Sequence, residues 1–407
     1  MSLAHSFRPG AENIRLPLLF AAEFCIIICM NELKREKLTF RGWFRLCPVR
    51  HCLALAGGLV IAAYFALRGN TPLMAAVCRG FVRPWHRFFS RLTAAVPFSV
   101  AELLLTLAVL AALAYLVIFV VRLIRRGGRV RTVYRFFATA VAAFAVIYGG
   151  FCLLWGVYYY GTDFEAASGV AGEPASPAQL ETVTRWFTDL ANEYGAQVQR
   201  NGSGEFAENP DAVFDRSASL YDAVESVFPC LAGDDVPAKP FFFSRAMSYI
   251  NFTGFFFPFT AEANINTDSP AAFVPSTIAH EIAHQRGVAP EDEANFCAVA
   301  ACLENGDPVY CYSAALMAYV YLGNALYSAD YDAWAENYER LSPGVRADLH
   351  ANNAYWAQFE TPVNTVSDAV YTGFLKSYGQ SDGLQTYGKC VDLLIAYYYN
   401  IALEALS

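Results

Sequence analysis

The residues best suited to chemistry are two histidines four positions apart, His280 and His284, in the segment AHEIAHQRGVAPEDEANFCA. Residues four apart lie on the same face of an α-helix, so both imidazole rings can reach one metal ion. Imidazole nitrogen is a common zinc ligand, and the HExxH pattern is typical of zinc sites carried on a helix. The spacing therefore predicts a Zn2+ ion held by His280 and His284.

A carboxylate stands directly after the first histidine. Glu281 points toward the adjacent edge of the same helix face, where it can contact a water molecule bound to the metal. Zinc lowers the pKa of such a water to about 7, and a neighbouring carboxylate can take its proton during attack on a carbonyl. Glu281 is therefore predicted to be the catalytic base of a hydrolytic reaction.

The alternative is a pair of structural histidines that share a helical face without a metal. The residues that follow favour the metal. Gly287 stands where the helix would end in a left-handed conformation, and Pro290 with a group of acidic residues begins a second helix at once. This second helix would bring carboxylates back toward the histidines, which a purely structural pair does not require.

The third ligand is predicted from a resemblance to the gluzincin metallopeptidases, which supply a Glu on a following helix in a Glu-x-x-Ala-Asp pattern. Residues 291–295, Glu-Asp-Glu-Ala-Asn, resemble this pattern with Asn in place of Asp. The resemblance implies that Glu291 is the third ligand. It also implies that Asn295, one helical turn later, does not bind the metal itself but orients one of the histidines. Glu293 is the alternative third ligand. A metzincin pattern fails, because its third histidine would fall at Pro290.

Three further polar residues are weaker candidates. His350 is the only other histidine after residue 160, and it could stabilise an oxyanion, although a surface position is the more common role. Asn264 and Asn266 could contact the backbone of a substrate. Their alternative role, as residues at turns and strand ends, has at least equal weight.

The elements that would position these residues are mainly helical. Ser176 is predicted to cap a helix that runs to about Arg200, residues 211–228 form a second helix, and the chain after Pro275 is helical almost to its end. Strands are predicted at residues 248–255 and 262–266. The fold class is therefore mainly α, with an α-rich α+β, zincin-like domain over residues 178–407 that contains a small β-sheet. An edge strand above the metal could pair with an extended substrate.

The N-terminal part of the chain is of a different kind. Three uncharged runs, at about residues 52–67, 103–121 and 136–160, are predicted to cross a lipid bilayer as helices. Residues 1–51 are predicted to be a cytoplasmic segment, within which the apolar stretch 16–31 is a further span, an uncleaved signal-like stretch or an extension of little structural meaning. Residues 161–177 are predicted to be a linker.

Charge is divided unevenly between the two halves. Residues 1–160 carry 19 basic residues (Lys and Arg) and 5 acidic residues (Asp and Glu). Residues 161–407 carry 10 basic and 32 acidic residues. The basic residues flank apolar runs, which indicates lipid headgroups and not nucleic acid as the partner. The basic loops at 34–50 and 122–135 are predicted to be cytoplasmic. This topology places the C-terminal domain on the extracytoplasmic side of the membrane. Loop 68–97 is also basic and is predicted to be an amphipathic helix at the membrane surface.

Several stretches together resemble a family of bacterial membrane proteins known as domain of unknown function 3810. They are PFSVAELL at 97–104, GFFFPFTAEANIN at 254–266, HEIAHQRG at 280–287 and EDEANF at 291–296. The resemblance implies several N-terminal spans in a bacterial plasma membrane and a C-terminal domain similar to zinc peptidases. It implies no particular substrate.

These features lead to a functional hypothesis with two alternatives. The hypothesis is a membrane-anchored zinc metallopeptidase that hydrolyses envelope proteins or peptides. One alternative is a zinc-containing sensor or binding protein that keeps the fold without hydrolysis, and the other is a structural membrane protein with an incidental HExxH. Glu281 favours hydrolysis, because a binding protein does not need a general base.

Overall fold

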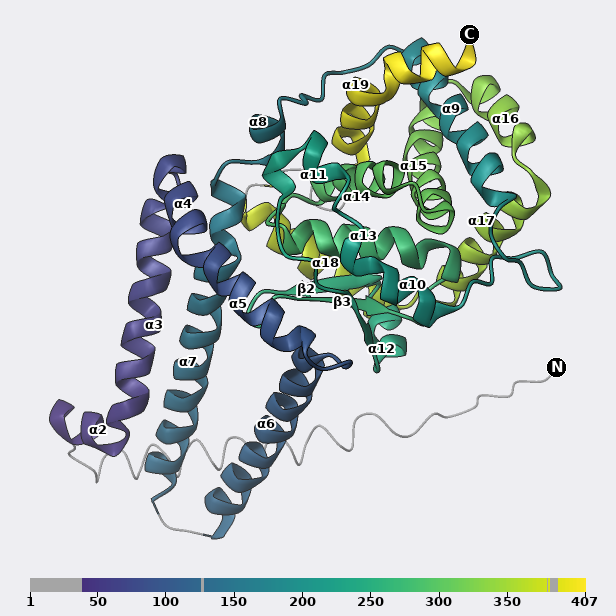
Figure 1. The fold of residues 1–407 in the computed structure, drawn as a ribbon. Helices are drawn as coiled ribbons and strands as arrows, with labels where there is room; N and C mark the ends of the chain where they lie inside the picture. The colour runs from purple at the N-terminus through teal and green to yellow at the C-terminus, as the bar shows by residue number, and fades with distance from the viewer. Residues whose placement is uncertain (1–38, 126–127, 379, 381–386) are drawn as a thin grey trace, which may run out of the picture. The chain divides into compact units, whose positions relative to one another are not determined.

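The computed structural model describes residues 39–125, 128–378, 380 and 387–407, and the chain divides into two compact units (Figure 1). One unit comprises the described residues up to Ala62 together with Thr106–Gly150. The other comprises Ala63–Leu105 and Phe151–Ser407, and we call it the metal unit because it contains His280, His284 and Glu291. The apolar stretch 16–31 lies outside the described residues.

Among the described residues, three helices are long and apolar enough to cross a membrane: α3 (Pro48–Leu67), α6 (Val100–Arg125) and α7 (Arg129–Leu154). They contain the cores of the three predicted spans. The third span was predicted to continue to residue 160, but α7 ends at Leu154 and a 3-10 turn, Gly156–Tyr160, follows it.

The shorter unit is built from the short helix α2 (Phe40–Leu46) and most of these three long helices. Helices α3 and α7 approach closely at Gly57, where an added Cβ atom would collide with the carbonyl of Ala145. Small residues of this kind allow two apolar helices to pack backbone against backbone. Between α3 and α7, His51 Nε2 also lies 2.6 Å from the hydroxyl of Tyr134.

The basic loop between the first two long helices is helical, as predicted. It consists of α4 (Thr71–Val77), a π-helical turn (Cys78–Val82) and α5 (Arg83–Ala94). Helix α5 has one buried face, which carries His86, Ser90 and Thr93, and one exposed face, which carries Arg87 and Phe88. Its indole at Trp85 donates to the carbonyl of Phe259, 3.3 Å away, so α5 is packed against the sheet region of the metal unit.

The sheet of the metal unit has three described strands in the order β1-β3-β2. Strand β3 (Glu262–Asn266) lies in the centre, parallel to β1 (Lys239–Phe241) and antiparallel to β2 (Gly254–Phe257). The register pairs Gly254 with Ile265, and every residue of β3 is buried. Strand β2 is therefore an edge strand, with one side free of a strand partner in the described sheet.

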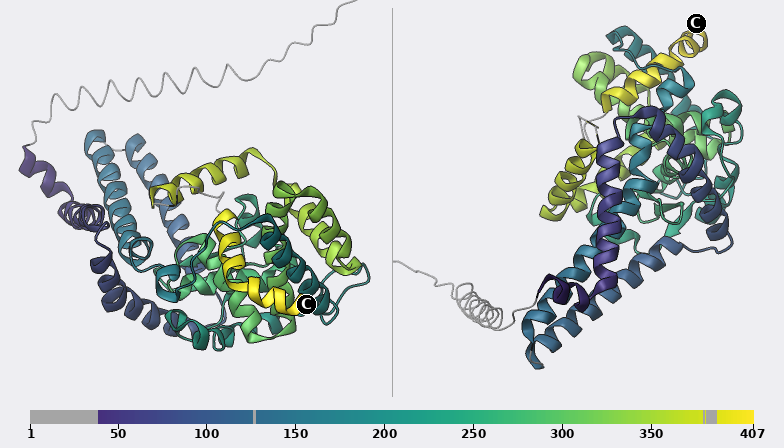
Figure 2. Two further views of the ribbon diagram at one scale, coloured as in Figure 1. Left: turned by 90° about the horizontal axis from the view of Figure 1, so that it is seen from above. Right: turned by 90° about the vertical axis from the view of Figure 1, so that its left-hand side faces the viewer.

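The remaining described helices of the metal unit surround this sheet and a core of apolar side chains. They are α8 (Phe164–Ser168), α9 (Pro177–Gly195), α10 (Pro210–Arg216), α11 (Val224–Val227), α12 (Ser244–Tyr249), α13 (Val274–Gln285), α14 (Glu291–Asn305), α15 (Pro308–Ala329), α16 (Tyr331–Arg340), α17 (Pro343–Trp356), α18 (Pro362–Ser377) and α19 (Tyr387–Leu406). Helix α13 packs on β3 and β2. Helices α9 and α19, the latter in yellow, lie side by side (Figure 2), and both pack against α15.

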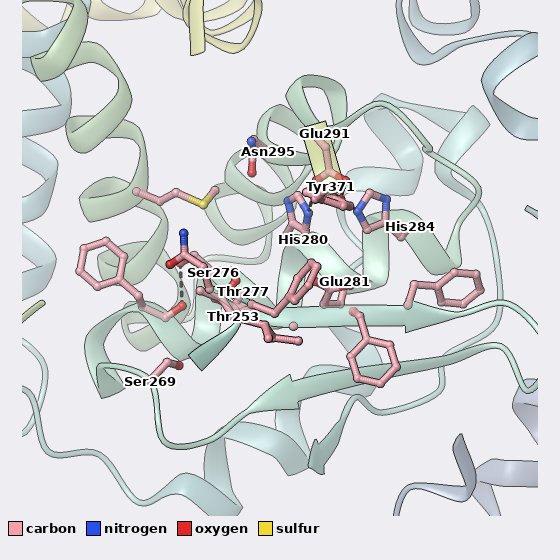
Figure 3. Close-up of a pocket in the computed structure, with 18 of the residues that line it drawn as sticks. Thr253, Ser269, Ser276, Thr277, His280, Glu281, His284, Glu291, Asn295 and Tyr371 are labelled. Carbon is pink, nitrogen blue, oxygen red and sulfur yellow. Dashed lines mark hydrogen bonds and ion pairs between the residues drawn. The ribbon is translucent and has the colours of Figure 1, made fainter. Parts of the chain in front are cut away.

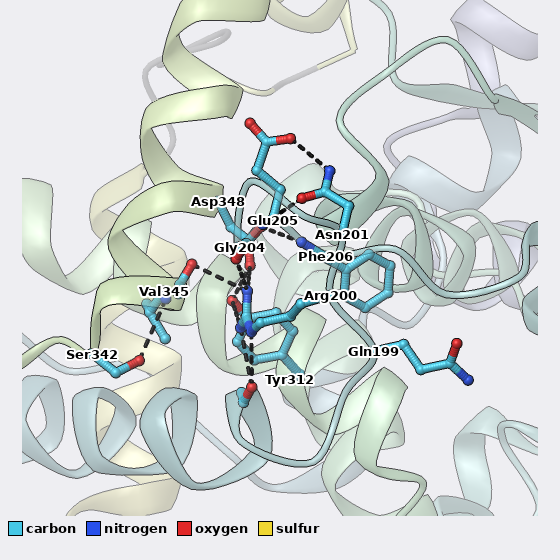
Figure 4. A network of polar contacts seen from close by, with 12 residues as sticks. Gln199, Arg200, Asn201, Gly204, Glu205, Phe206, Tyr312, Ser342, Val345 and Asp348 are labelled. Atoms are coloured by element: carbon cyan, nitrogen blue, oxygen red, sulfur yellow. Dashed lines mark hydrogen bonds and ion pairs between the residues drawn. The ribbon is translucent and has the colours of Figure 1, made fainter.

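Helix α9 begins at the predicted residue and ends earlier than predicted. Ser176 and Gln179 form a capping box, with Pro177 in the first turn. The helix ends at Gly195 and not near Arg200, because the Arg200 guanidinium folds back and donates to the carbonyl of Gly195. Arg200 also pairs with the buried carboxylate of Asp348 at 2.9 Å, and the hydroxyl of Tyr312 contacts both groups (Figure 4). This network ties α9 to α15 and α17.

Two predicted elements were wrong. Residues 248–255 do not form one strand, because Ser248 and Tyr249 end α12 and Asn251 adopts a positive φ of 63°, so only the last two residues enter β2. Residues 211–228 do not form one helix. The hydroxyl of Ser217 binds the carbonyl of Phe214 and the N–H of Ala238, and this competing contact ends α10.

The segment 161–177, predicted to be a linker, is partly structured. It contains α8, which Asp163 caps by accepting from the N–H of Ala166, and Gly169 ends it with a positive φ of 78°. The Phe164 side chain is buried between Phe228 and Phe296. The start of this segment is therefore packed into the core of the metal unit.

Candidate metal centre

The two histidines share one face of α13, and their ring centroids are 4.6 Å apart. Helix α13 ends at Gln285, the chain turns within five residues, and α14 begins at Glu291. The turn carries the first residue of α14 back toward the histidines, so the three side chains point toward one another (Figure 3). The structure thus brings together His280, His284 and Glu291, the three predicted ligands.

The distances between the ligand atoms fit one zinc ion. Glu291 Oε2 lies 3.1 Å from His280 Nε2 and 3.6 Å from His284 Nε2. Zinc bonds of 2.0–2.2 Å in a tetrahedron separate neighbouring ligand atoms by about 3.3–3.5 Å. The two distances lie on either side of this range, so a metal would need only small movements of the side chains. Within the part of the chain that the structure describes, no other three ligand-type side chains converge in this way.

The electrostatics of the three ligands are strongly coupled. Burial opposes ionisation of Glu291, but the charge of His284 and hydrogen bonds from both histidines hold the pKa of its carboxyl well below the usual range. Burial by itself would lower the pKa of His284. The negative charge of the neighbouring Glu291, together with hydrogen bonds to His284, has the larger effect and raises this pKa to about 9. The two shifts favour an ion pair between protonated His284 and ionised Glu291, whose proton a bound metal would displace.

The backbone that follows α13 orients His284. Gly287 has a φ of 93°, its N–H donates to the carbonyl of His284, and the N–H of Val288 donates to the carbonyl of Ala283. These two bonds form a Schellman motif. They place the carbonyl of Val288 2.7 Å from His284 Nδ1, so Nδ1 carries the hydrogen and Nε2 is left for the metal.

The carboxylate of Glu291 is held by a residue that the sequence did not indicate. The Tyr371 hydroxyl, on α18, donates to Glu291 Oε1 at 2.6 Å. Glu291 Oε2 is thereby turned toward the histidines. Tyr371 lies 80 positions after Glu291 and is one of 24 tyrosines, and nothing in the local sequence distinguishes it from the others.

Glu281 lies beside the three ligands and is buried, with 4% of its surface exposed. Burial raises the pKa of its carboxyl to about 7. Strand β2 passes so close that a Cβ atom at Gly254 would lie 2.7 Å from the Oε1 atom of Glu281. The other oxygen, Oε2, has no hydrogen-bond partner among the described residues and is available to a ligand of the site.

A cavity of about 680 Å³ opens beside these residues. Its wall includes His280, Glu281, His284, Glu291 and the edge strand β2, and much of the remaining lining is aromatic, including Phe151, Trp155, Phe252, Phe273, Trp356 and Phe374. The cavity contains no Lys or Arg side chain in its described lining, and Asp368 is its one carboxylate besides Glu281 and Glu291. The space suits an apolar, uncharged or cationic ligand.

The other predicted residues have different surroundings. Glu293 is fully buried and accepts the N–H of Phe164 at 2.9 Å, so the alternative third ligand is directed to α8 and not to the histidines. Asn295 lies in the cavity wall, but its amide makes no hydrogen bond to either histidine in the described structure. His350 is exposed on α17 and does not line the cavity.

Asn264 and Asn266 lie in β3 and are not among the residues that line the cavity. Both are fully buried in β3. The amide of Asn264 donates to the carbonyl of Glu262 at 2.9 Å, and the amide of Asn266 donates to the carbonyl of Phe252 and to Ser248 Oγ, both at 2.9 Å. Both amides satisfy backbone and side-chain groups next to the sheet, which agrees with their alternative role as strand residues.

Comparison with known proteins places the chain in a family. Residues 78–395 match the family described as "Protein of unknown function (DUF3810)". No curated protein and no solved structure matches the chain. The matched region begins in the π-helical turn before α5, contains every residue of the candidate metal centre, and ends within α19. Because the match covers most of the 407 residues, the chain belongs to this family of proteins of unknown function.

Proposed function

We propose that this protein is a membrane-anchored zinc metallopeptidase that hydrolyses peptide bonds of envelope proteins or peptides. The observation that carries the proposal is the arrangement of four side chains: His280, His284 and Glu291 converge at distances that suit zinc, and the buried carboxylate of Glu281 lies beside them. The HExxH helix followed by a Glu-bearing helix supports a zincin-like organisation of the gluzincin type.

Zinc bound there would polarise a carbonyl and lower the pKa of a bound water to about 7. The protein's own residues would supply the remainder of the reaction. The unpartnered Oε2 atom of Glu281 would accept the proton of the attacking water and later deliver it to the leaving amine. The Tyr371 hydroxyl and the Val288 carbonyl would hold Glu291 and His284 in place during these steps.

Strand β2 would hold the substrate. It is an edge strand, it lines the cavity, and its Gly254 is in contact distance of Glu281. An extended peptide that pairs with such an edge gains backbone hydrogen bonds without any requirement on its sequence. Gly254 is required here, because any side chain on the face toward Glu281 would displace the carboxylate.

We further propose a multi-pass protein of a bacterial plasma membrane, with the metal unit on the extracytoplasmic side. The three long apolar helices support membrane insertion. The clusters of Lys and Arg at residues 34–50 and 122–135 support the orientation, because basic loops remain in the cytoplasm.

The proposal is tested by comparing the peptides of the cell envelope between cells with the wild-type protein and cells with Glu281→Gln. The variant keeps the size of the side chain and removes the base, so hydrolysis should fall by at least about 100-fold while zinc remains bound. Glu336→Gln, at an exposed position on α16, is the matched control. Identical peptides from wild-type and Glu281→Gln cells, with zinc present in both proteins, would refute the peptidase mechanism.

A further inference from the structure

The ends of the three long helices that lie in the metal unit are all attached to elements of the candidate site. The end of α3 is fixed by the Tyr64 hydroxyl, which donates to the carbonyl of Gly156 at 3.0 Å. The next turn is fixed by Arg68, which donates to the carbonyl of Ser377 at the end of α18. Helix α18 is the element that presents Tyr371 to Glu291.

The start of α6 is attached to the sheet. The N–H groups of Val100 and Ala101 donate to the carboxylate of Glu262 at 3.0 and 2.8 Å. A carboxylate at this position satisfies the free N–H groups of the first turn and is favoured by the helix dipole. Glu262 is buried and is also paired with Lys239 on β1 at 2.8 Å. Because Glu262 belongs to β3, the strand that contacts α13, the first turn of α6 is connected through this strand to the helix with the histidines.

The end of α7 forms part of the cavity wall itself. Phe151, in the last turn of α7, lines the cavity together with Trp155 and Tyr159 directly after it. The Trp155 ring lies edge-on to the ring of His284, with the centroids 5.4 Å apart. Trp155, the residue directly after α7, therefore contacts a candidate metal ligand. Trp is also the residue type that favours the headgroup region of a bilayer.

We infer that the substrate is a polypeptide anchored in the same bilayer, cut close to the point where it leaves the membrane. This inference rests on the proposed peptidase function and specifies its substrate. The ends of the three long apolar helices are attached within the metal unit, and Trp155, directly after α7, contacts His284, so a bilayer crossed by these helices would end close to the candidate metal centre. A chain that emerges from the bilayer reaches β2 without a long extended segment.

The chemistry of the cavity agrees with such a substrate. Segments next to a membrane span carry large apolar and aromatic side chains. The cavity offers aromatic walls, and the charged groups in its described lining outside the histidines are the three carboxylates Glu281, Glu291 and Asp368. Acidic juxtamembrane segments would be repelled, whereas apolar or basic ones fit.

The test uses the full-length wild-type protein in nanodiscs of phosphatidylethanolamine and phosphatidylglycerol. The probes are single-span polypeptides that carry one reporter segment rich in Leu and Phe. A Gly-Ser spacer places this reporter about 3, 10 or 25 residues from the membrane, and each residue adds at most about 3.5 Å. The long-spacer probe is the matched control, because it is co-localised with the enzyme and differs only in the position of the reporter. A soluble peptide of the same sequence completes the series.

We expect the short-spacer probe to be cut at least about tenfold faster than the long-spacer probe, because its reporter lies near the membrane surface. Anchoring raises the effective concentration of both probes, so a difference in rate reports the position of the reporter. Equal rates for the short and long spacers, or an equal rate for the soluble peptide, would overturn the inference and leave the peptidase function intact. Cleavage that persists in Glu281→Gln would instead count against the proposed function.

A second measurement does not depend on hydrolysis. Co2+ is loaded into the site in place of zinc, and quenching of a fluorescent dye on the lipid headgroups is measured. A site at the membrane surface predicts strong quenching that disappears in His280→Ala. Unquenched headgroup dye with Co2+ bound would overturn the inference. Quenching without cleavage of any probe would contradict the proposed hydrolysis and, with it, the substrate assigned here.

Discussion

The carbonyl oxygen of Val288 lies 2.7 Å from Nδ1 of His284, four residues earlier in the chain. This carbonyl belongs to the residue that completes the Schellman motif at the end of α13. The turn that ends the helix therefore also fixes the orientation of a candidate metal ligand. Helix termination and ligand orientation depend on one glycine, Gly287, whose φ of 93° makes the turn possible.

Replacing Gly287 with Ala should disturb both functions of the turn. A side chain at a positive φ costs about 1–2 kcal/mol. The new Cβ atom would also lie 2.7 Å from the ring of Tyr158, so the backbone must shift. Because the shift moves the Val288 carbonyl, we expect zinc affinity to fall by about 10-fold or more, measured by competition with a chelator.

The matched control for this change is Gly306→Ala. Gly306 ends α14 with a similar φ of 74°, but an added Cβ atom there meets no other atom within 4 Å. The Gly306→Ala variant should have a free energy of unfolding lower by about 1–2 kcal/mol and an unchanged zinc affinity. Equal loss of zinc affinity in the two variants would show that the Val288 carbonyl does not support the metal.

Removal of the Tyr371 hydroxyl should weaken the site without changing its ligands. Tyr371→Phe keeps the ring in the cavity wall and deletes the 2.6 Å hydrogen bond to Glu291 Oε1. Contacts of this kind are typically worth about 10–100-fold in metal affinity, so chelator competition should detect the loss. Tyr331→Phe, at an exposed position on α16, is the control. Wild-type zinc affinity in Tyr371→Phe would contradict the supporting role.

The part of the site that is local in sequence could be predicted. His280 and His284 are one helical turn apart, and Gly287 and Pro290 place a group of acidic residues in the first turn of the next helix, from which the resemblance to gluzincins selects Glu291. Short-range geometry of this kind follows from helix period and capping rules. For the same reason, the long apolar runs predicted α3, α6 and the body of α7.

The remainder depends on contacts between distant segments, which no local pattern encodes. Tyr371 reaches Glu291 only because α18 packs across the cavity, and the Val288 contact uses a backbone carbonyl that any residue possesses. The error at residues 248–255 has a similar origin. β-branched and aromatic residues there suggested a strand, but Asn251 adopts a left-handed turn that the tertiary structure requires.

A buried histidine away from the metal should make the fold sensitive to acid. Burial lowers the pKa of His86 to about 4, from an ordinary value near 6.5. Below pH 6.5 the unfolded chain takes up this proton more readily than the folded chain does, so stability falls from pH 6.5 down to pH 4. The full loss is about 3 kcal/mol.

His86→Phe should remove this part of the pH dependence, because His86 packs against the rings of Tyr158 and Phe256 and Phe can occupy the same place. The free energy of unfolding is measured with urea at pH 7 and pH 4.5. His350→Phe, at an exposed position on α17, should retain the wild-type difference between the two pH values. A wild-type difference in His86→Phe would show that another group is responsible.

The metal content of the purified protein tests the central claim most directly. The convergence of His280, His284 and Glu291 predicts about one zinc ion per chain in the wild type, measured by elemental analysis after dialysis. Replacing either histidine with Ala should abolish this binding, whereas Glu293→Gln, which alters a carboxylate directed to α8, should retain it. A wild-type protein without zinc, or a His280→Ala variant that binds as much zinc as the wild type, would contradict the account.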